Sequence, residues 1–157
     1  MIGFRLFGIA HVCCFYKIFI RDCFRVVSIH FINTISFISC ISIINTHDDN
    51  TIDYRETFRV LYLNQCNQVL GIKTISTGGV TNSLVDVRTI LQGALLANAV
   101  AMTLGHNHPS GNVKPSREDE RITDQISKAA QLLNIRVLDH IVYTRENHFS
   151  FSDQGRL

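Results

Sequence analysis

Residues 99–122, AVAMTLGHNHPSGNVKPSREDERI, contain the pattern that decides the fold of this chain. The apolar run Ala99–Leu104 predicts a central strand. The sequence Gly-His-Asn-His follows it, and a Pro-Ser-Gly turn signal comes next. Ser116 is a favoured helix N-cap residue, and the apolar positions after it recur at helical spacing. The stretch therefore predicts a strand, a sharp turn and a helix in succession.

The sequence on either side of this stretch extends the pattern to further strands and helices. Alternating or continuous apolar runs predict strands, and apolar residues at helical spacing after Asp86 predict another helix. The expected order is strand, strand, helix, strand, helix, strand, strand, which predicts an α/β fold with helices packed on a mixed β-sheet. The predicted strands cover residues 58–63, 69–75, 99–104, 135–144 and 148–151, and the predicted helices cover 86–97 and 116–133.

Composition divides the chain of 157 residues into two unlike parts. Residues 1–53 hold four of the five cysteines and seven of the ten phenylalanines, and their charges cancel. Residues 54–157 have the composition of an ordinary globular domain and carry the whole net charge of +2. We therefore expect one domain at 54–157, preceded by a hydrophobic extension at 1–53 to which no domain is assigned.

Charge and cysteine spacing limit the partners and the compartment. A net charge of +2 gives no support for a protein that binds DNA backbones in general. Residues 26–46 carry no formal charge, but their many polar side chains make membrane insertion unfavourable. No C-x-x-C pair is present, which favours reduced thiols and a cytoplasmic location. The sequence leaves the oligomeric state open.

Three side chains of the quoted stretch form a candidate metal site. His106 and His108 are two residues apart at the end of the predicted strand, and side chains at that spacing point the same way. Asp119 lies in the first turn of the predicted helix, on the face of Ile122 and Ile126 that should pack inward. Two neutral imidazoles and a carboxylate are the ligand set of a catalytic zinc, which keeps a fourth position for water.

A hydrolytic zinc site also needs a general base. Zinc lowers the pKa of its water from about 15.7 towards about 7, and a carboxylate commonly accepts the proton that this water loses. Glu56 stands directly before the strand predicted at residues 58–63. A neighbouring strand of the sheet could therefore bring its carboxylate to the site.

These residues resemble a known motif in type and spacing. The segment HNHPSGNVKPSREDE, followed by LLNIRVLDHIVYT, is similar to the RadC branch of bacterial JAB-domain proteins, over about two thirds of the chain. The residues that match the JAMM motif of MPN-type zinc metalloproteases are Glu56, His106, His108, Ser116 and Asp119.

The resemblance implies a fold similar to that of cytidine deaminases, with a mixed β-sheet flanked by helices. It implies that Zn²⁺ is bound by His106, His108 and Asp119. It further implies that Glu56 moves a proton from water to the leaving amine, and that Ser116 helps to stabilise the oxyanion. The activity it implies is the hydrolysis of peptide or isopeptide bonds in a peptide or protein substrate.

Two other functions stay open at this point. One is a DNA-repair-associated accessory protein without peptidase activity, whose DNA affinity would fall steeply with salt. The other is an interaction module that zinc stabilises without catalysis. Deaminase and zincin chemistry are excluded because the P-C-x-x-C and H-E-x-x-H sequences are absent. We expect His140, Asp139 and Tyr143 to have structural roles.

Overall fold

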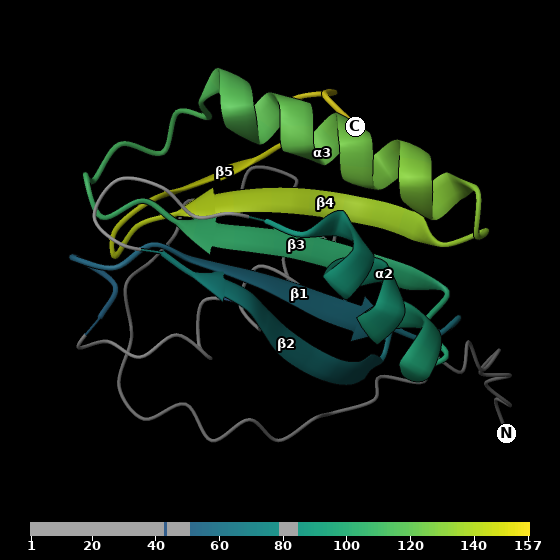
Figure 1. The fold of residues 1–157 in the computed structure, drawn as a ribbon. Helices are drawn as coiled ribbons and strands as arrows, with labels where there is room; N and C mark the ends of the chain where they lie inside the picture. Colours follow the sequence, from purple (N-terminus) through teal and green to yellow (C-terminus); the bar gives the residue numbers. More distant parts are fainter. Residues whose placement is uncertain (1–42, 44–50, 79–84) are drawn as a thin grey trace, which may run out of the picture. The chain divides into compact units, whose positions relative to one another are not determined.

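The computed structural model describes residue 43 and residues 51–78 and 85–157. The strands form one five-stranded sheet in the order β2-β1-β3-β4-β5 (Figure 1). Strands β3 and β4 are parallel and every other neighbouring pair is antiparallel, so the predicted α/β fold with a mixed sheet is confirmed. The elements are β1 (Thr57–Leu63), β2 (Val69–Thr77), α2 (Val87–Leu96), β3 (Ala101–Asn107), α3 (Arg117–Gln131), β4 (Arg136–Tyr143) and β5 (His148–Ser150).

The central strand differs from its predicted bounds in a way that matters for the site. It runs from Ala101 to Asn107, whereas the apolar run alone predicted residues 99–104. Pairing explains the difference, because His106 lies opposite Phe58 of β1 and Asn107 lies opposite Tyr143 of β4. Backbone partners on both sides keep the chain extended beyond the last apolar residue. The strand therefore includes the first histidine of the predicted metal site.

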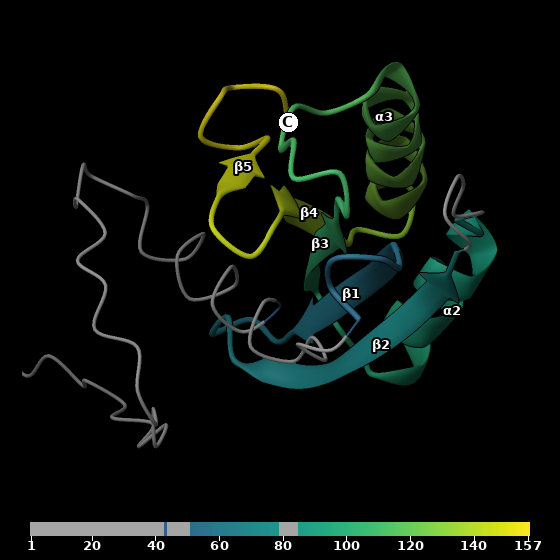
Figure 2. The same ribbon diagram turned by 90° about the vertical axis from the view of Figure 1, so that its left-hand side faces the viewer.

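The two described helices pack on the same face of the sheet, as Figure 2 shows. Side chains alternate between the faces of a strand, and the even-numbered positions of β1 and β3 point towards the helices. The predicted caps are present, since Asp86 accepts from the N–H of Arg88, and Ser116 accepts from the N–H of Asp119. The buried residues of this cluster are Phe58, Val60, Tyr62, Ile90, Ala94, Ala99, Met102, Leu104, Ile122, Ile126, Ala130 and Ile135.

A second cluster covers the opposite face of the sheet. Odd-numbered strand residues meet Ile43 and Ile52 there, and both isoleucines are buried. The Ile43 side chain lies so close to Gly105 that a Cβ at this glycine would collide with it. The domain boundary between residues 53 and 54 stays a prediction, because most of residues 1–50 lies outside the described part. Neither α2 nor α3 has the length and apolar character that crossing a membrane requires.

Helix α3 makes the crossover between the parallel strands β3 and β4. Parallel neighbours need such a connection, and here only residues 108–116 separate the end of β3 from the start of the helix. The first turn of α3 therefore lies near the carboxyl end of β3. This is how the topology brings Asp119 close to His106.

Candidate metal centre

His106, His108 and Asp119 lie together at the carboxyl end of β3. One ligand atom from each residue falls within a group whose members are all within 4.8 Å of one another. The two Nε2 atoms of the histidines are 2.9 Å apart. Asp119 Oδ1 is 3.2 Å from His106 Nε2, and Asp119 Oδ2 is 3.6 Å from His108 Nε2. The donor atoms of the predicted set thus converge on a single position.

In both His106 and His108 the other ring nitrogen, Nδ1, already has a hydrogen-bond partner. His106 Nδ1 is 2.9 Å from Nε2 of His140, and His108 Nδ1 is 2.7 Å from the carbonyl oxygen of Asn112. A carbonyl can only accept, so His108 Nδ1 carries a hydrogen, and the neutral ring keeps its lone pair on Nε2. A metal ligand with its second nitrogen anchored in this way is fixed in both tautomer and orientation.

Charge at the site is balanced between the carboxylate and the imidazoles. Burial alone would raise the pKa of Asp119, but its close polar contacts with His106 and His108 outweigh burial and hold this pKa well below its usual range. Burial lowers the pKa of His108, but its contacts with Asp119 and the Asn112 carbonyl outweigh burial and raise it. Beyond these effects, the charge of Glu56 also raises the pKa of His108. The site thus attracts a positive charge, either a proton or a cation.

Ser116 holds the carboxylate of Asp119 in place. Its hydroxyl and its backbone N–H both donate to Asp119 Oδ2, each over 2.7 Å, and the hydroxyl accepts from the N–H of Asp119. Together these bonds form a capping box at the start of α3. The structure therefore places Ser116 against a predicted ligand, and its role towards an oxyanion stays a prediction.

Glu56 lies beside the three converging residues without belonging to the group itself. Its carbonyl oxygen accepts from the N–H of Gly78, which ties it to the end of β2. The antiparallel register ends at the pair of Phe58 and His106, two residues after Glu56 and two residues before His108. The effect of the Glu56 charge on the pKa of His108 agrees with this placement.

Asn107 is a residue of the site that the sequence reasoning missed. Its side chain is completely buried on the face of β3 opposite to His106. Its Nδ2 donates to the carbonyl oxygens of Ile52 and Arg55 over 2.7 and 2.8 Å, and its Oδ1 accepts from the N–H of Thr57 over 2.8 Å. These three bonds clamp the segment that carries Glu56. The sequence did offer a signal for this role. Asn107 is a polar residue that stands between two candidate ligands, at a strand position that should be buried.

Replacing Asn107 with Leu is expected to lower the free energy of unfolding by about 3 kcal/mol, because it leaves buried backbone groups unpaired. Denaturant titration measures this change. As a control, Asn147→Ala alters an exposed asparagine and is expected to change stability by less than about 0.5 kcal/mol. Equal stability of Asn107→Leu and the parent chain would show that the clamp is dispensable.

His140 and Asp139 occupy buried positions on β4, as expected for structural residues. Asp139 accepts from the Ser150 hydroxyl over 2.7 Å and from the N–H of Ser152 over 3.0 Å, which ties β4 to β5 and the turn after it. His140 is enclosed, and burial lowers its pKa well below the ordinary value, with the charge of His106 as a further cause. His140 is therefore a completely buried imidazole that touches a predicted ligand.

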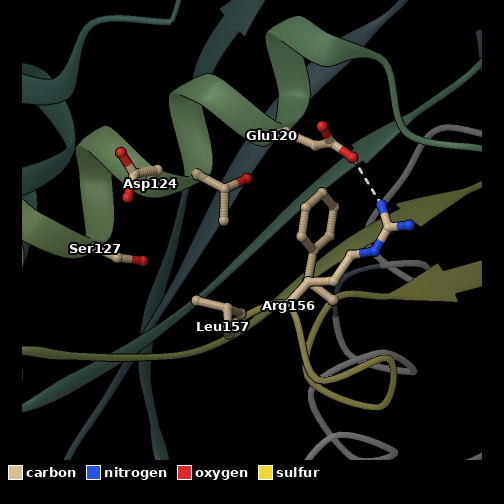
Figure 3. A pocket seen from close by; sticks show the side chains of 7 residues that line it. Glu120, Asp124, Ser127, Arg156 and Leu157 are labelled. Atoms are coloured by element: carbon tan, nitrogen blue, oxygen red, sulfur yellow. Dashed lines mark hydrogen bonds and ion pairs between the residues drawn. The ribbon is translucent and has the colours of Figure 1, made fainter.

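A separate cavity of about 380 Å³ lies between α3 and the C-terminal segment (Figure 3). Its charged side chains are already paired, since Glu120 bonds to Arg156 and Asp124 bonds to Lys128, each over 2.7 Å. The charged side chains that line this cavity are therefore neutralised by their partners and do not indicate a ligand site. The cavity is lined by Glu120, Thr123, Asp124, Ser127, Phe151, Arg156 and Leu157.

Comparisons with known proteins agree with this geometry. Residues 39–156 match the family model described as RadC-like JAB domain. The UPF0758 protein YeeS of Escherichia coli (strain K12) is 45% identical over 103 residues, which cover 66% of this chain and 70% of YeeS. The UPF0758 protein YfjY of the same organism is 42% identical over 103 residues, covering 66% of this chain and 64% of YfjY.

A third relative is longer than the part that this chain matches. A UPF0758 protein of Flavobacterium johnsoniae is 40% identical over 100 residues, which cover 64% of this chain but only 44% of that protein. The chain thus spans less than half of this relative and slightly less than two thirds of YfjY. The family match nevertheless covers most of the chain and includes every residue of the candidate site. The chain belongs to the RadC-like JAB domain family.

Proposed function

We propose that this domain is a zinc-dependent hydrolase of peptide or isopeptide bonds. The observation that carries the proposal is the convergence of His106 Nε2, His108 Nε2 and the Asp119 carboxylate within 4.8 Å. Membership of the RadC-like JAB domain family supports it.

The donor set fits a catalytic zinc ion. It offers two imidazole nitrogens and one carboxylate, which is the three-ligand arrangement that leaves a further position open. The contact from His108 Nδ1 to the Asn112 carbonyl directs the lone pair of that ring to the common position. The two bonds from Ser116 leave Asp119 Oδ1 directed at His106. When bound there, Zn²⁺ supplies Lewis acidity, which makes hydroxide available at neutral pH.

The chain's own residues supply the rest of the proposed chemistry. Glu56, which directly precedes β1, accepts a proton from the attacking water and passes it to the leaving amine. Ser116 stabilises the developing oxyanion, for which its hydroxyl must turn away from Asp119 Oδ2. The proposed substrate is a peptide or protein. Specificity in such folds lies in loops and partners.

The test combines metal analysis with an assay of the full chain. We expect elemental analysis to find about one zinc per chain, which also separates zinc from Fe²⁺, a metal that the same donor set can bind. A library of fluorogenic peptides and ubiquitin-like fusions should contain a substrate that is cleaved with zinc, spared after chelation and cleaved again once zinc is restored. His108→Ala should lose metal and turnover together. His148→Ala, a histidine exposed on β5, is the matched control and should keep both.

Each alternative function predicts a different result. One zinc per chain without cleavage of any library member would overturn the hydrolase and favour a zinc-stabilised interaction module. Binding to branched or single-stranded DNA that falls steeply with salt, again without cleavage, would favour the DNA-repair accessory protein. Metal content that is equal in His108→Ala and the parent chain would overturn the site itself.

A further inference from the structure

A continuous chain of hydrogen bonds joins two of the three proposed ligands behind the site. It starts at the backbone carbonyl of Asp119 and passes through the Thr123 hydroxyl, 2.6 Å away. From there it continues to His140 Nδ1, also over 2.6 Å, and from His140 Nε2 to His106 Nδ1 over 2.9 Å. None of these contacts uses the nitrogen of His106 that faces the ligand position.

The hydrogen-bond partners fix the direction of every bond in this chain. A carbonyl oxygen cannot donate, so the single hydrogen of the Thr123 hydroxyl must point to Asp119. The hydroxyl then has only lone pairs left for His140, whose Nδ1 must therefore carry a hydrogen. His140 is completely buried, which disfavours a charged ring, and a neutral imidazole has one N–H. His140 Nε2 therefore accepts, and His106 Nδ1 donates to it.

The direction of these hydrogen bonds decides which nitrogen of His106 is free to bind a metal. A neutral His106 with its hydrogen on Nδ1 keeps a lone pair on Nε2, which is the atom 3.2 Å from Asp119 Oδ1. The opposite tautomer would point a hydrogen at the metal position and prevent coordination. Ring stacking holds both imidazoles in place, with His140 on Phe151 at 5.0 Å and His106 on Phe58 at 5.9 Å between centroids.

We propose that Thr123 and His140 are positioning residues that hold His106 in the metal-binding tautomer, by a relay of hydrogen bonds anchored on the backbone of Asp119. The proposal rests on the proposed function, because it takes the three ligands as a metal site. Anchoring on Asp119 means that the first turn of α3 both supplies one ligand and sets the hydrogen position of another. The relay is the counterpart, for His106, of the single bond from His108 to Asn112.

Three variants of α3 test the relay through zinc affinity rather than turnover. Thr123→Val keeps the shape of the side chain but leaves His140 Nδ1 without an acceptor, and should weaken zinc binding by about 10- to 100-fold in competition with a chelating dye. Thr123→Ser restores the hydroxyl and should recover most of the affinity. Ser127→Ala lies one turn further along and lines the same cavity (Figure 3). It removes a hydroxyl that has no hydrogen-bond partner among the described residues and should leave affinity unchanged.

A direct reading of the tautomers tests the relay without any variant. Nitrogen NMR of the zinc-loaded parent chain should show a hydrogen on Nδ1 of both His106 and His140. A hydrogen on Nε2 of His140 would overturn the proposal, and so would an affinity of Thr123→Val within about twofold of the parent. These readouts do not depend on hydrolysis. A protein that binds zinc but cleaves nothing would refute the proposed function, and the relay would still be judged on its own.

Discussion

Adding Zn²⁺ to the metal-free protein is expected to raise its melting temperature by about 10 °C. The three ligands are brought together only by folding, because Asp119 comes from α3 and the histidines from the end of β3. A ligand that binds only the native state stabilises it by about 2.7 kcal/mol at a free concentration of 100 times its Kd. For a domain of this size, each kcal/mol corresponds to about 4 °C.

The specificity of this stabilisation is checked with ligand and control variants. Thermal unfolding of His108→Ala should show little change on adding Zn²⁺, since one of its three donors is gone. His148→Ala should show the full increase, because that side chain is exposed on β5 and outside the site. An equal increase in His108→Ala and the parent chain would place the zinc elsewhere.

The order of elements and the ligand group could be predicted because they depend on local patterns. The spacing of His106 and His108 sets them on one side of an extended chain, and the helix capped by Ser116 sets Asp119 on its inward face. The short connection from β3 to α3 then leaves little freedom for where these faces meet. The prediction of a metal-binding group needed only residues that are close in sequence.

Contacts between strands could not be predicted in the same way. Periodicity tells which face of a strand a side chain occupies, but the register decides which residue of the next strand it meets. His140 meets His106 because β4 pairs in parallel with β3, and Asn107 clamps the segment at Ile52–Thr57 because β1 pairs with β3. Both are partners distant in sequence. Their roles became visible only when the sheet order was known.

The start of the predicted domain stays a prediction, and it has a different basis. Composition set the boundary at residue 54, and composition reports an average over many residues rather than the contact of one side chain. Ile43 and Ile52 are buried against strand residues of the second cluster, and the family match starts at residue 39. Isolated apolar contacts of this kind leave no periodic signal in the sequence of the N-terminal segment.

Glu56→Gln is expected to lower kcat by about 10²- to 10⁴-fold while zinc content stays the same. The amide of Gln matches the carboxylate in shape but cannot accept a proton at neutral pH. Glu56 is not one of the three converging ligands, so its replacement should not release the metal. The charge of Glu56 raises the pKa of His108, which supports a proton acceptor near the site. Turnover and zinc content are measured on the same preparation, with the substrate found in the library.

Glu146→Gln provides the control for this comparison, because it removes one carboxylate at an exposed position between β4 and β5. It should leave kcat unchanged. A lower kcat in Glu56→Gln would then result from the position of the lost carboxylate and not from the change in the net charge of the protein. If Glu56→Gln lost zinc as well as turnover, Glu56 would act on the metal position itself and not as a base. If its kcat equalled that of the parent chain, the proton would have to be taken by another group, and the assignment of Glu56 as the base would be wrong.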